Sequence, residues 1–206
     1  MSQTAVVTGG SGGIGSEVVS QLRAQGWEVT SLSRREGWDV SDEDQVVKAF
    51  ARFDALDALV CCAAELVKRP FMELTAEEWD RQLGAGLRGA FLCAREAFRL
   101  MRGGGGAIVM VSSLSGVFGA EKFPGMAAYV AAKSGLAGLT EALAVEGRPL
   151  RIRVNAVSPG AVDTPMLRIA GVEGPALSPA EVARTIVWLA SPESAPLSGA
   201  NLRMDP

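Results

Sequence analysis

Thr8-Gly9-Gly10-Ser11-Gly12-Gly13-Ile14-Gly15, residues 8–15, is the stretch that decides the fold. It follows a short apolar run at residues 5–7 and precedes residues 14–25, where apolar side chains recur at helical spacing. A strand, a glycine-rich turn and a helix in this order are typical of the place where a dinucleotide pyrophosphate meets a helix N-terminus. Glycine is needed there because a Cβ atom would keep the backbone away from the phosphates. The alternative is an ordinary glycine-rich turn, and the strand–turn–helix context near the N-terminus favours the phosphate site.

Short apolar runs alternate with helical patterns along the rest of the chain. This alternation predicts strands at residues 27–33, 56–63, 107–112, 151–157 and 200–204, and helices at residues 41–53, 75–101, 127–146 and 178–190. The long helix is expected to be interrupted near Gly84 and Gly86, and residues 164–177 are expected to form a surface loop near a ligand site. Apolar strands separated by helices predict an α/β fold in three layers, a Rossmann-like doubly wound parallel sheet in one domain over residues 1–206.

The composition of the 206 residues excludes several function classes. Histidine is absent, which removes the commonest metal ligand and the commonest general base, and the three cysteines have no metal-binding spacing. Cys61 and Cys62 lie in an apolar run and are expected to pack in the core. The net charge is −3, and there is no basic cluster for nucleic acid. No apolar run reaches the ~20 residues of a membrane span, and residues 1–4 do not resemble a signal peptide, so we expect a cytoplasmic protein.

The residues after the second predicted strand bear on the choice of dinucleotide. An acidic residue about 20 positions after the glycine turn ordinarily binds the ribose 2′-hydroxyl of NAD. Arg34 and Arg35 stand there instead. A guanidinium attracts a 2′-phosphate through charge-assisted and often bidentate hydrogen bonds, so the pair favours NADP over NAD. The alternative is a pair of solvated surface arginines, and the Glu36 that follows is expected to face solvent or an arginine.

Tyr129 and Lys133 are four residues apart in a predicted helix, which places them on one face. A tyrosine is a poor acid or base at neutral pH, and a neighbouring ammonium is expected to lower its pKa. Taken alone, the pair is also what an amphipathic helix carries by chance. The ends of two predicted strands favour a catalytic role for this pair. Ser112-Ser113 follows one apolar strand, where a hydroxyl is placed to polarise a carbonyl, and residues 155–160 end the next.

These features together resemble the classical short-chain dehydrogenase/reductase family over nearly the whole chain. The motifs that carry the resemblance are Thr8-Gly9-x-x-x-Gly13-x-Gly15, Asp39-Val40, Ser113, Tyr129-x-x-x-Lys133 and residues 155–160. Each motif is weak alone, and their order and spacing together are specific. The resemblance implies a Rossmann-like sheet of about seven strands, commonly assembled into homodimers or homotetramers.

The resemblance also implies a role for each site residue. Ser113 would hydrogen-bond the substrate oxygen, Tyr129 would donate or accept its proton, and Lys133 would bind the nicotinamide ribose and lower the pKa of Tyr129. The other residues that would contact NADP(H) are Gly9, Ser11, Gly13, Ile14 and Gly15 at the phosphates and adenine-side ribose, Arg34 at the 2′-phosphate, Asp39 and Val40 at adenine, Ala63 and Ala64 beside the cofactor, and Pro159, Gly160, Val162 and Thr164 on the nicotinamide side. The implied function is hydride transfer between NADP(H) and a carbonyl or secondary alcohol, with no metal, nucleic acid or membrane as partner.

The chain departs from the family pattern in two short motifs. Cys61-Cys62-Ala63-Ala64 stands where the family usually has Asn-Asn-Ala-Gly. Gly86 stands where the family tends to carry an asparagine that helps to hold a water in a proton relay. A glycine has no side chain to orient a water, so the relay is expected to run through a backbone carbonyl or to be impaired.

Three segment lengths also depart from the family. The helix that normally follows the second strand is expected to be missing, because few residues separate Arg35 from Asp39. Residues 118–123 lengthen the connection between Ser113 and Tyr129, and we expect them to add an apolar wall to the substrate pocket. Residues 164–177 are short for a lid, which predicts an open and less selective site.

Two other functions fit part of this pattern. The main alternative is an NADP-binding sensor or interaction protein with weak or no catalysis, which the departures at Gly86 and at residues 61–64 support. The retained Ser113, Tyr129 and Lys133 favour the enzyme, since a sensor needs no proton donor. An epimerase or dehydratase of the related extended family is disfavoured, because such chains need an extra substrate region for which 206 residues leave little room. Apolar side chains at Val162, Met166 and Leu167 suggest a hydrophobic or aromatic carbonyl substrate.

Overall fold

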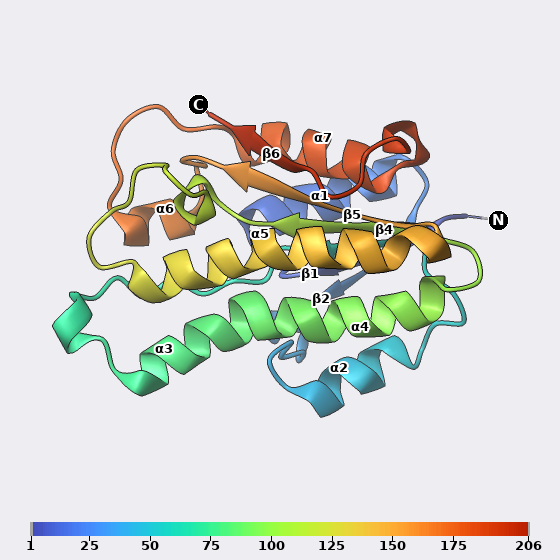
Figure 1. Cartoon of the computed structure of the whole chain (residues 1–206), viewed down its shortest axis with the longest axis horizontal. Coiled ribbons are helices and arrows are strands. Elements are labelled where there is room, and N and C mark those ends of the chain that lie inside the picture. The colour runs from blue at the N-terminus through green and yellow to red at the C-terminus, as the bar shows by residue number, and fades with distance from the viewer. Residues whose placement is uncertain (1, 206) are drawn as a thin grey trace.

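A single sheet of six parallel strands forms the centre of the computed structural model, which describes residues 2–205. The strands are β1 (Thr4–Thr8), β2 (Glu28–Leu32), β3 (Ala58–Cys61), β4 (Gly106–Val111), β5 (Ile152–Pro159) and β6 (Asn201–Met204), in the order β2-β1-β3-β4-β5-β6. Every neighbouring pair is parallel. Helices lie on both faces of the sheet (Figure 1), so the predicted α/β, doubly wound fold is confirmed.

The described sheet has six strands where the family resemblance implies about seven. A parallel connection takes a dozen or more residues, and the few residues between the end of β2 and Asp39 cannot hold both a helix and another strand. Arg34–Glu36 form one 3-10 turn, and Gly37 follows in a left-handed conformation with φ at 84°. The predicted loss of the helix after the second strand is therefore confirmed, and an edge strand is lost with it.

Seven α-helices are found in residues 2–205: α1 (Gly13–Ala24), α2 (Glu43–Phe50), α3 (Ala76–Leu83), α4 (Gly89–Met101), α5 (Ala127–Gly147), α6 (Pro165–Ala170) and α7 (Pro179–Ala190). Helices α1 and α7 pack together on one face of the sheet, α4 and α5 lie on the other, and α2 packs on the outside of α4 (Figure 1). The strands contribute buried side chains to both layers, among them Val6, Leu59, Ile108 and Val154 on the α4–α5 side and Val7, Val60, Val109 and Val157 on the α1–α7 side. This burial on both faces explains why the central strands β1, β3 and β4 read as nearly continuous apolar runs.

Side-chain caps set where several helices begin. The Thr75 hydroxyl accepts a hydrogen bond from the backbone N–H of Glu78, whose carboxylate reaches back to the N–H of Thr75. Ser178 and Glu181 make the same reciprocal pair at the start of α7. Helix α2 begins one residue later than a cap at Ser41 would place it, because Asp42 accepts from the backbone N–H groups of the first turn.

The predicted helix break near Gly84 and Gly86 and the predicted loop at residues 164–177 both differ from the structure. The helix does not break near Gly84 and Gly86; instead Gly84–Arg88 form a π-helical turn that joins α3 to α4, and the N–H of Gly89 donates to the carbonyl of Gly84. A π turn absorbs one extra residue without ending the helix. Residues 164–177 are not wholly irregular either, since Pro165 opens the short helix α6 and Gly171 ends it with φ at 59°.

The strand order places a crevice above the carboxyl ends of β1 and β3. From β1 the chain passes to β2 on one side, and from β2 it returns to β3 on the other side of β1. Ligands of open parallel sheets bind where the connections diverge in this way. Within residues 2–205, no helix has the length and apolar character needed to cross a membrane.

Candidate active site

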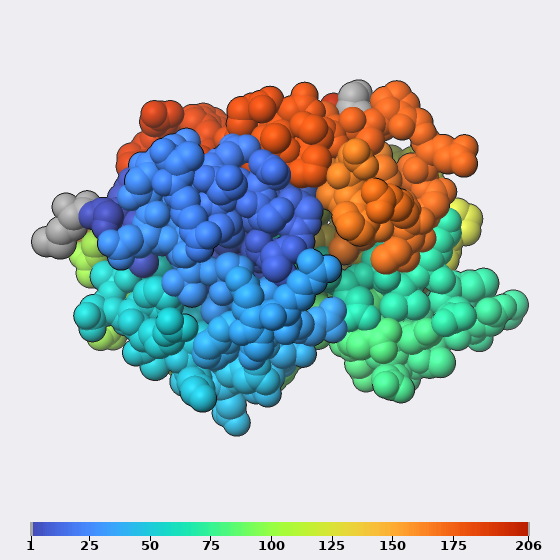
Figure 2. Space-filling view, turned by 180° about the vertical axis from the view of Figure 1, so that it is seen from behind, coloured from blue at the N-terminus to red at the C-terminus, as the bar shows by residue number. Residues whose placement is uncertain are grey.

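Two adjoining cavities lie at the carboxyl edge of the sheet. The glycine-turn cavity, of about 440 Å³, is lined by the turn after β1, the ends of β2 and β3, and part of α6. The outer-loop cavity, of about 430 Å³, is lined by the connections after β4 and β5. Ile14, Tyr129 and Thr164 line both, so the two cavities meet at these side chains. Figure 2 shows the surface hollowed between the blue N-terminal segment and the orange segment that contains α6.

Every predicted site residue lines one of these cavities. The glycine-turn cavity is lined by Gly9, Ser11, Gly13, Ile14, Gly15, Arg34, Asp39, Val40, Ala63, Ala64, Tyr129, Lys133 and Thr164. The outer-loop cavity is lined by Ser113, Pro159, Gly160 and Val162, and the predicted residues Ile14, Tyr129 and Thr164 line both cavities. The fold thus brings together residues from five separate connections, while their roles toward a cofactor or a substrate stay predictions.

The glycine turn is packed backbone against backbone. Gly9 has a left-handed φ of 66°, and a Cβ atom on it would lie 2.9 Å from the backbone of Ala63. A Cβ atom on Gly15 would lie 2.3 Å from the carbonyl oxygen of Gly9. Helix α1 begins beside this turn at Gly13, with no side-chain cap and no acidic residue in its first turn. An uncapped helix N-terminus that opens into a cavity fits the pyrophosphate of a dinucleotide.

Polar and charged side chains after β2 lie at one end of the glycine-turn cavity. The Asp39 carboxylate accepts hydrogen bonds from the backbone N–H and the hydroxyl of Ser41, at 2.9 and 2.7 Å. Glu36 is exposed, as predicted, and its carboxylate also accepts from the hydroxyls of Ser31 and Ser33, which lower the pKa of Glu36. Arg34 is exposed at the cavity wall, where the sequence places a contact to a 2′-phosphate.

Ser113, Tyr129 and Lys133 converge where the cavities meet. The strand β4 ends at Val111, and Ser113 follows with its hydroxyl accepting from the backbone N–H of Ser115 at 3.1 Å. Helix α5 presents Tyr129 and the buried Lys133 one turn apart, with Lys133 Nζ 5.5 Å from the centroid of the Tyr129 ring. Lys133 Nζ donates to the carbonyl oxygen of Val111 at 2.6 Å, which ties α5 to the end of β4.

Burial dominates the electrostatics of this pair. It lowers the pKa of Lys133 to about 8, because an ammonium is poorly solvated there. It raises the pKa of Tyr129, and the hydrogen bond with Ser113 acts in the opposite direction but is weaker. The net shift of the Tyr129 pKa is upward because desolvation of the phenolate is the larger effect, and the lowering of this pKa by Lys133 stays a prediction. A protonated phenol at neutral pH is the form that can donate a proton.

Comparisons with known proteins show the family to which this chain belongs. Residues 36–206 match the family described as enoyl-(acyl carrier protein) reductase. The chain is 35% identical over 206 residues to cyclopentanol dehydrogenase of Comamonas sp. (strain NCIMB 9872), covering 93% of this chain and 81% of that protein. The chain belongs to the classical short-chain dehydrogenase/reductase family.

Two further similarities bear on this short-chain dehydrogenase/reductase. It is 38% identical over 165 residues to trans-4-hydroxycyclohexanecarboxylate dehydrogenase of Sinomonas cyclohexanicum, covering 76% of this chain. That alignment spans 62% of the relative, which is less than two thirds of its length. The solved structure of ElxO with NADP bound has a TM-score of 0.88 at 27% identity, covering 100% of this chain and 98% of that chain.

The structure buries one of the two neighbouring cysteines, Cys61, and leaves the other, Cys62, partly exposed. Cys61 is buried at the end of β3, where burial raises the pKa of its thiol, so the predicted core packing holds there. Cys62 is only partly buried and lines the glycine-turn cavity, and burial of its thiol raises its pKa to about 12. Both thiols stay protonated at neutral pH. The backbone N–H of Ala63 donates to the Thr8 hydroxyl at 3.2 Å, which holds this connection against β1.

The family asparagine position is held by Gly86 within the π turn. Gly86 is buried beside α5, and a Cβ atom on it would lie 3.4 Å from the Cβ atom of Ala132. The space is therefore sufficient for a small side chain. Nothing in this geometry requires glycine at this position.

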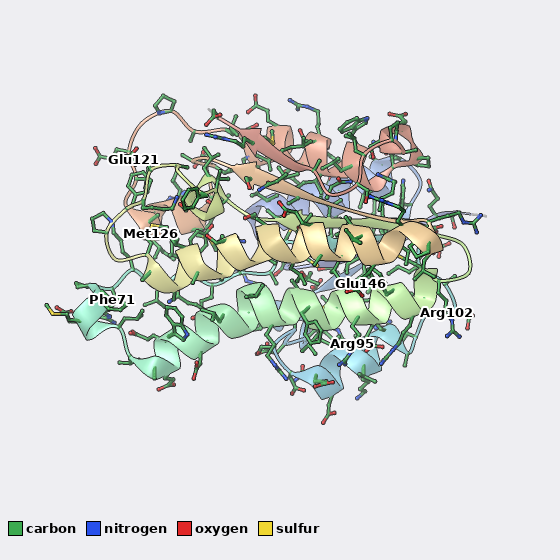
Figure 3. All side chains as sticks on the ribbon, in the orientation of Figure 1. Phe71, Arg95, Arg102, Glu121, Met126 and Glu146 are labelled. Atoms are coloured by element: carbon green, nitrogen blue, oxygen red, sulfur yellow. The ribbon has the colours of Figure 1, made fainter. Side chains whose placement is uncertain are left out.

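The outer-loop cavity is mainly apolar. Its apolar lining includes Leu66, Leu114, Phe123, Met126, Val162, Met166 and Leu167. Phe118 is fully exposed and does not line the cavity, so the predicted apolar wall comes from the end of the long connection and not from its start. Charged side chains of Glu121, Glu173, Arg203 and Asp205 complete the lining. Figure 3 shows Glu121 and Met126 on the connection that leads into α5.

Sequence reasoning missed Glu65, which lines the glycine-turn cavity directly after Ala64. Its Oε2 lies 3.2 Å from Arg34 Nη1, and its Oε1 accepts a hydrogen bond from Arg81 Nε. The available signal is a single acid at the end of an otherwise apolar strand and turn, residues 58–64. An acidic side chain so close to a strand end that faces the glycine turn is unexpected, because a negative charge there would repel the phosphates predicted to bind at that turn.

Proposed function

We propose that this chain transfers a hydride between NADP(H) and a carbonyl or secondary alcohol, with Tyr129 as the proton donor in reduction and the acceptor in oxidation. The convergence of Ser113, Tyr129 and Lys133 at the junction of the two cavities carries the proposal. A sensor would need the glycine-turn cavity alone, whereas this arrangement places a proton donor beside a second, apolar cavity of about 430 Å³.

The residues of the glycine-turn cavity would hold the dinucleotide. The uncapped N-terminus of α1 would receive the pyrophosphate, and the ends of β2 and β3 would flank the adenosine. When bound, NADPH would supply the hydride for the carbonyl carbon. The Ser113 hydroxyl would orient the substrate oxygen, and the Tyr129 hydroxyl would give that oxygen its proton. The Lys133 ammonium, fixed on the Val111 carbonyl, would position the ribose beside Tyr129.

An apolar cyclic carbonyl is the substrate class that we infer. The outer-loop cavity is lined mainly by aliphatic and aromatic side chains, which favour a ligand of low polarity. Two relatives are named for cyclic alcohols, cyclopentanol and trans-4-hydroxycyclohexanecarboxylate. NADP rather than NAD is supported by Arg34 at the cavity wall and by the NADP bound to the similar protein ElxO.

Turnover of NADPH with a panel of cyclic ketones tests the reaction. We expect the parent to oxidise NADPH, measured by absorbance of the reduced nicotinamide, and Tyr129→Phe to lower the rate by about 10²- to 10⁴-fold. The affinity for NADPH, measured by fluorescence titration, should stay within about twofold, because the substitution removes only a hydroxyl. NADPH binding without turnover on any ketone, and no difference between the parent and Tyr129→Phe, would support the sensor instead.

The cofactor preference has its own test. Arg34→Ala should weaken NADPH binding about tenfold or more and leave NADH binding within about twofold, since only NADPH carries the 2′-phosphate. Arg95→Ala is a suitable control, because Arg95 pairs with Glu43 on the outside of α4 (Figure 3). Equal losses for the two dinucleotides would contradict the assignment of Arg34.

A further inference from the structure

Glu65 is held between two arginines from different parts of the chain. Arg34 comes from the 3-10 turn after β2, and Arg81 comes from α3. The carboxylate contacts both, with Oε2 3.2 Å from Arg34 Nη1 and Oε1 accepting from Arg81 Nε. The Glu65 side chain is 16% exposed, against 61% for Arg34 and 45% for Arg81. The carboxylate is therefore the fixed member of the group, and the arginines reach toward it from the surface.

The second carboxylate oxygen is not fully satisfied. Oε2 is buried and has no hydrogen-bond partner of good geometry among the described residues, although Arg34 lies within ion-pair distance. A buried carboxylate oxygen that lacks a hydrogen bond attracts cations and repels anions more strongly than a solvated one. The Arg34 guanidinium is the cation nearest to Oε2 among the described ion pairs.

Glu65 and Arg34 line the same cavity, on walls that come from different strands. The cavity wall around them also includes Ser11, Asp39 and Ala63. The pair therefore joins the connection after β2 to the connection after β3, at the end of the cavity where the adenosine would lie. A 2′-phosphate that reached Arg34 would have to meet or displace this carboxylate.

We propose that Glu65 sets the cofactor preference by competing with the 2′-phosphate for Arg34. The inference rests on the proposed function, in which Arg34 is the 2′-phosphate contact. Carboxylate and phosphate both bind a guanidinium through charge-assisted hydrogen bonds, so one excludes or weakens the other. Arg81 keeps the carboxylate in place, and the acid cannot simply turn away when a phosphate arrives. Glu65 thus reduces the advantage of NADP over NAD below what Arg34 alone would give.

The balance of charge around Arg34 supports this role. Arg34, Arg35 and Glu65 line the cavity together with Asp39, so the fixed charges nearly cancel there. Replacing one acid by a neutral isostere leaves a net positive wall. The Arg34–Glu65 pair is partly exposed, and such pairs are worth only about 1 kcal/mol or less, so a phosphate can displace it at a modest cost. Glu65 would therefore weaken the preference for NADP over NAD without preventing a 2′-phosphate from reaching Arg34.

Two nucleotides that differ only in the 2′-phosphate provide the test. Adenosine 2′,5′-bisphosphate and adenosine 5′-monophosphate are titrated into the full chain by calorimetry, with no turnover needed. Glu65→Gln keeps the size of the side chain and removes its charge. We expect it to bind the bisphosphate about threefold to fivefold more tightly than the parent, with the monophosphate changed by less than about twofold.

A double-mutant cycle and a control substitution at a second glutamate test whether the effect of Glu65 depends on Arg34. In an Arg34→Ala background, Glu65→Gln should gain less than about twofold for the bisphosphate, because the competition for Arg34 no longer exists. Glu43→Gln is the control, since Glu43 also pairs with two arginines, Arg88 and Arg95, but lies outside both cavities. It should change neither affinity.

The outcomes separate this inference from the proposed function. Binding of the bisphosphate to the parent with no gain in Glu65→Gln would overturn the role of Glu65 and leave the dinucleotide site standing. An undiminished gain in the Arg34→Ala background would also overturn it, since Glu65 would then act without Arg34. Failure of the parent to bind either nucleotide would contradict the proposed function, and the role of Glu65 would fall with it.

Discussion

The glycine-turn cavity and the outer-loop cavity share Tyr129 but are built in different ways. The first is made by strand ends and the start of α1, where Gly9 packs against Ala63 and Gly15 packs against Gly9 with no room for a Cβ atom. The second is made by long connections whose side chains face a cavity or the solvent, such as Phe123 and Phe118. One cavity is shaped by backbone, and the other is shaped by side chains.

This difference explains what each half of the site can tolerate. Where the first cavity is shaped by backbone, at Gly9 and Gly15, an added Cβ atom has no room. A cavity formed by side chains on surface connections can change its ligand without changing the fold. Substitutions in the two halves should therefore differ in what they alter, with folding and dinucleotide binding affected in the first and substrate selection affected in the second.

The largest effect is expected at the glycine turn. Gly15→Ala places a Cβ atom 2.3 Å from the carbonyl oxygen of Gly9, and the backbone has to move to relieve the contact. We expect a loss of about 3 kcal/mol or more in the free energy of unfolding, together with loss of nucleotide binding. Urea unfolding and nucleotide titration measure the two effects.

Gly138→Ala is the matched control for this substitution. Gly138 lies within α5, and a Cβ atom on it would meet nothing within 4 Å. Alanine is favoured over glycine inside a helix, so we expect a gain of about 0.5–1 kcal/mol with no change in nucleotide binding. Similar stabilities for the two variants would contradict the view that the glycine turn is shaped by backbone contact.

A second and smaller effect should come from Lys133, at the junction of the cavities. Burial lowers the pKa of Lys133 from 10.5 to about 8. Between these values the folded chain has released a proton that the unfolded chain keeps, so raising the pH in this range favours the folded state. Relative to Lys133→Met, the parent should gain on the order of 2 kcal/mol in the free energy of unfolding between pH 8 and pH 10.

The comparison with Lys133→Met is essential to this measurement. Burial raises the pKa of the Cys62 and Cys93 thiols to about 12 and also raises the pKa of Tyr129. These groups lose stability as the pH rises, because the unfolded chain ionises first. Both proteins contain them, so the difference between the two reports Lys133 together with its lowering of the Cys61 and Cys62 pKa values. A difference that is flat or that falls from pH 8 to pH 10 would show that Lys133 is not desolvated as its burial indicates.

The two halves also differ in how far sequence alone predicts them. The glycine turn could be predicted because its signal is local, with a strand, the glycines and a helix consecutive in residues 5–25. The strands β1, β3 and β4 could be predicted for the same reason, since each is a nearly continuous apolar run, whereas β2 and β6 contain polar residues and are placed by their position between turns and helices. Ser113, Tyr129 and Lys133 could be predicted only from the order and spacing of several motifs taken together. The structure places the three residues at the junction of the two cavities.

What could not be predicted depends on contacts between distant residues. Glu65 meets Arg34 and Arg81 only because three separate connections converge at one end of the sheet. The raised pKa of Tyr129 follows from enclosure by the fold, and a helical spacing of four residues says nothing of solvation. The exposure of Phe118 could not be predicted either, since its connection has no periodic pattern that would assign a buried side.

The smallest effect is expected in the outer-loop cavity, where Phe123 and Phe118 provide a matched pair on one connection. Phe123 lines the cavity and packs near Leu66 and Met126, whereas Phe118 is fully exposed. Phe123→Ala should raise the KM for an apolar cyclic ketone about fivefold, which corresponds to about 1 kcal/mol of lost apolar contact. Phe118→Ala should leave that KM unchanged and keep the free energy of unfolding within about 0.5 kcal/mol.

The affinity for NADPH should be the same in both phenylalanine variants and in the parent, because neither side chain lines the glycine-turn cavity. Steady-state kinetics with one ketone and fluorescence titration of NADPH provide the two readouts. A rise in KM for both variants would mean that the whole connection closes over the substrate. A change in NADPH affinity would mean that the two halves of the site are coupled, and the division into a backbone-shaped cavity and a side-chain-shaped cavity would then be wrong.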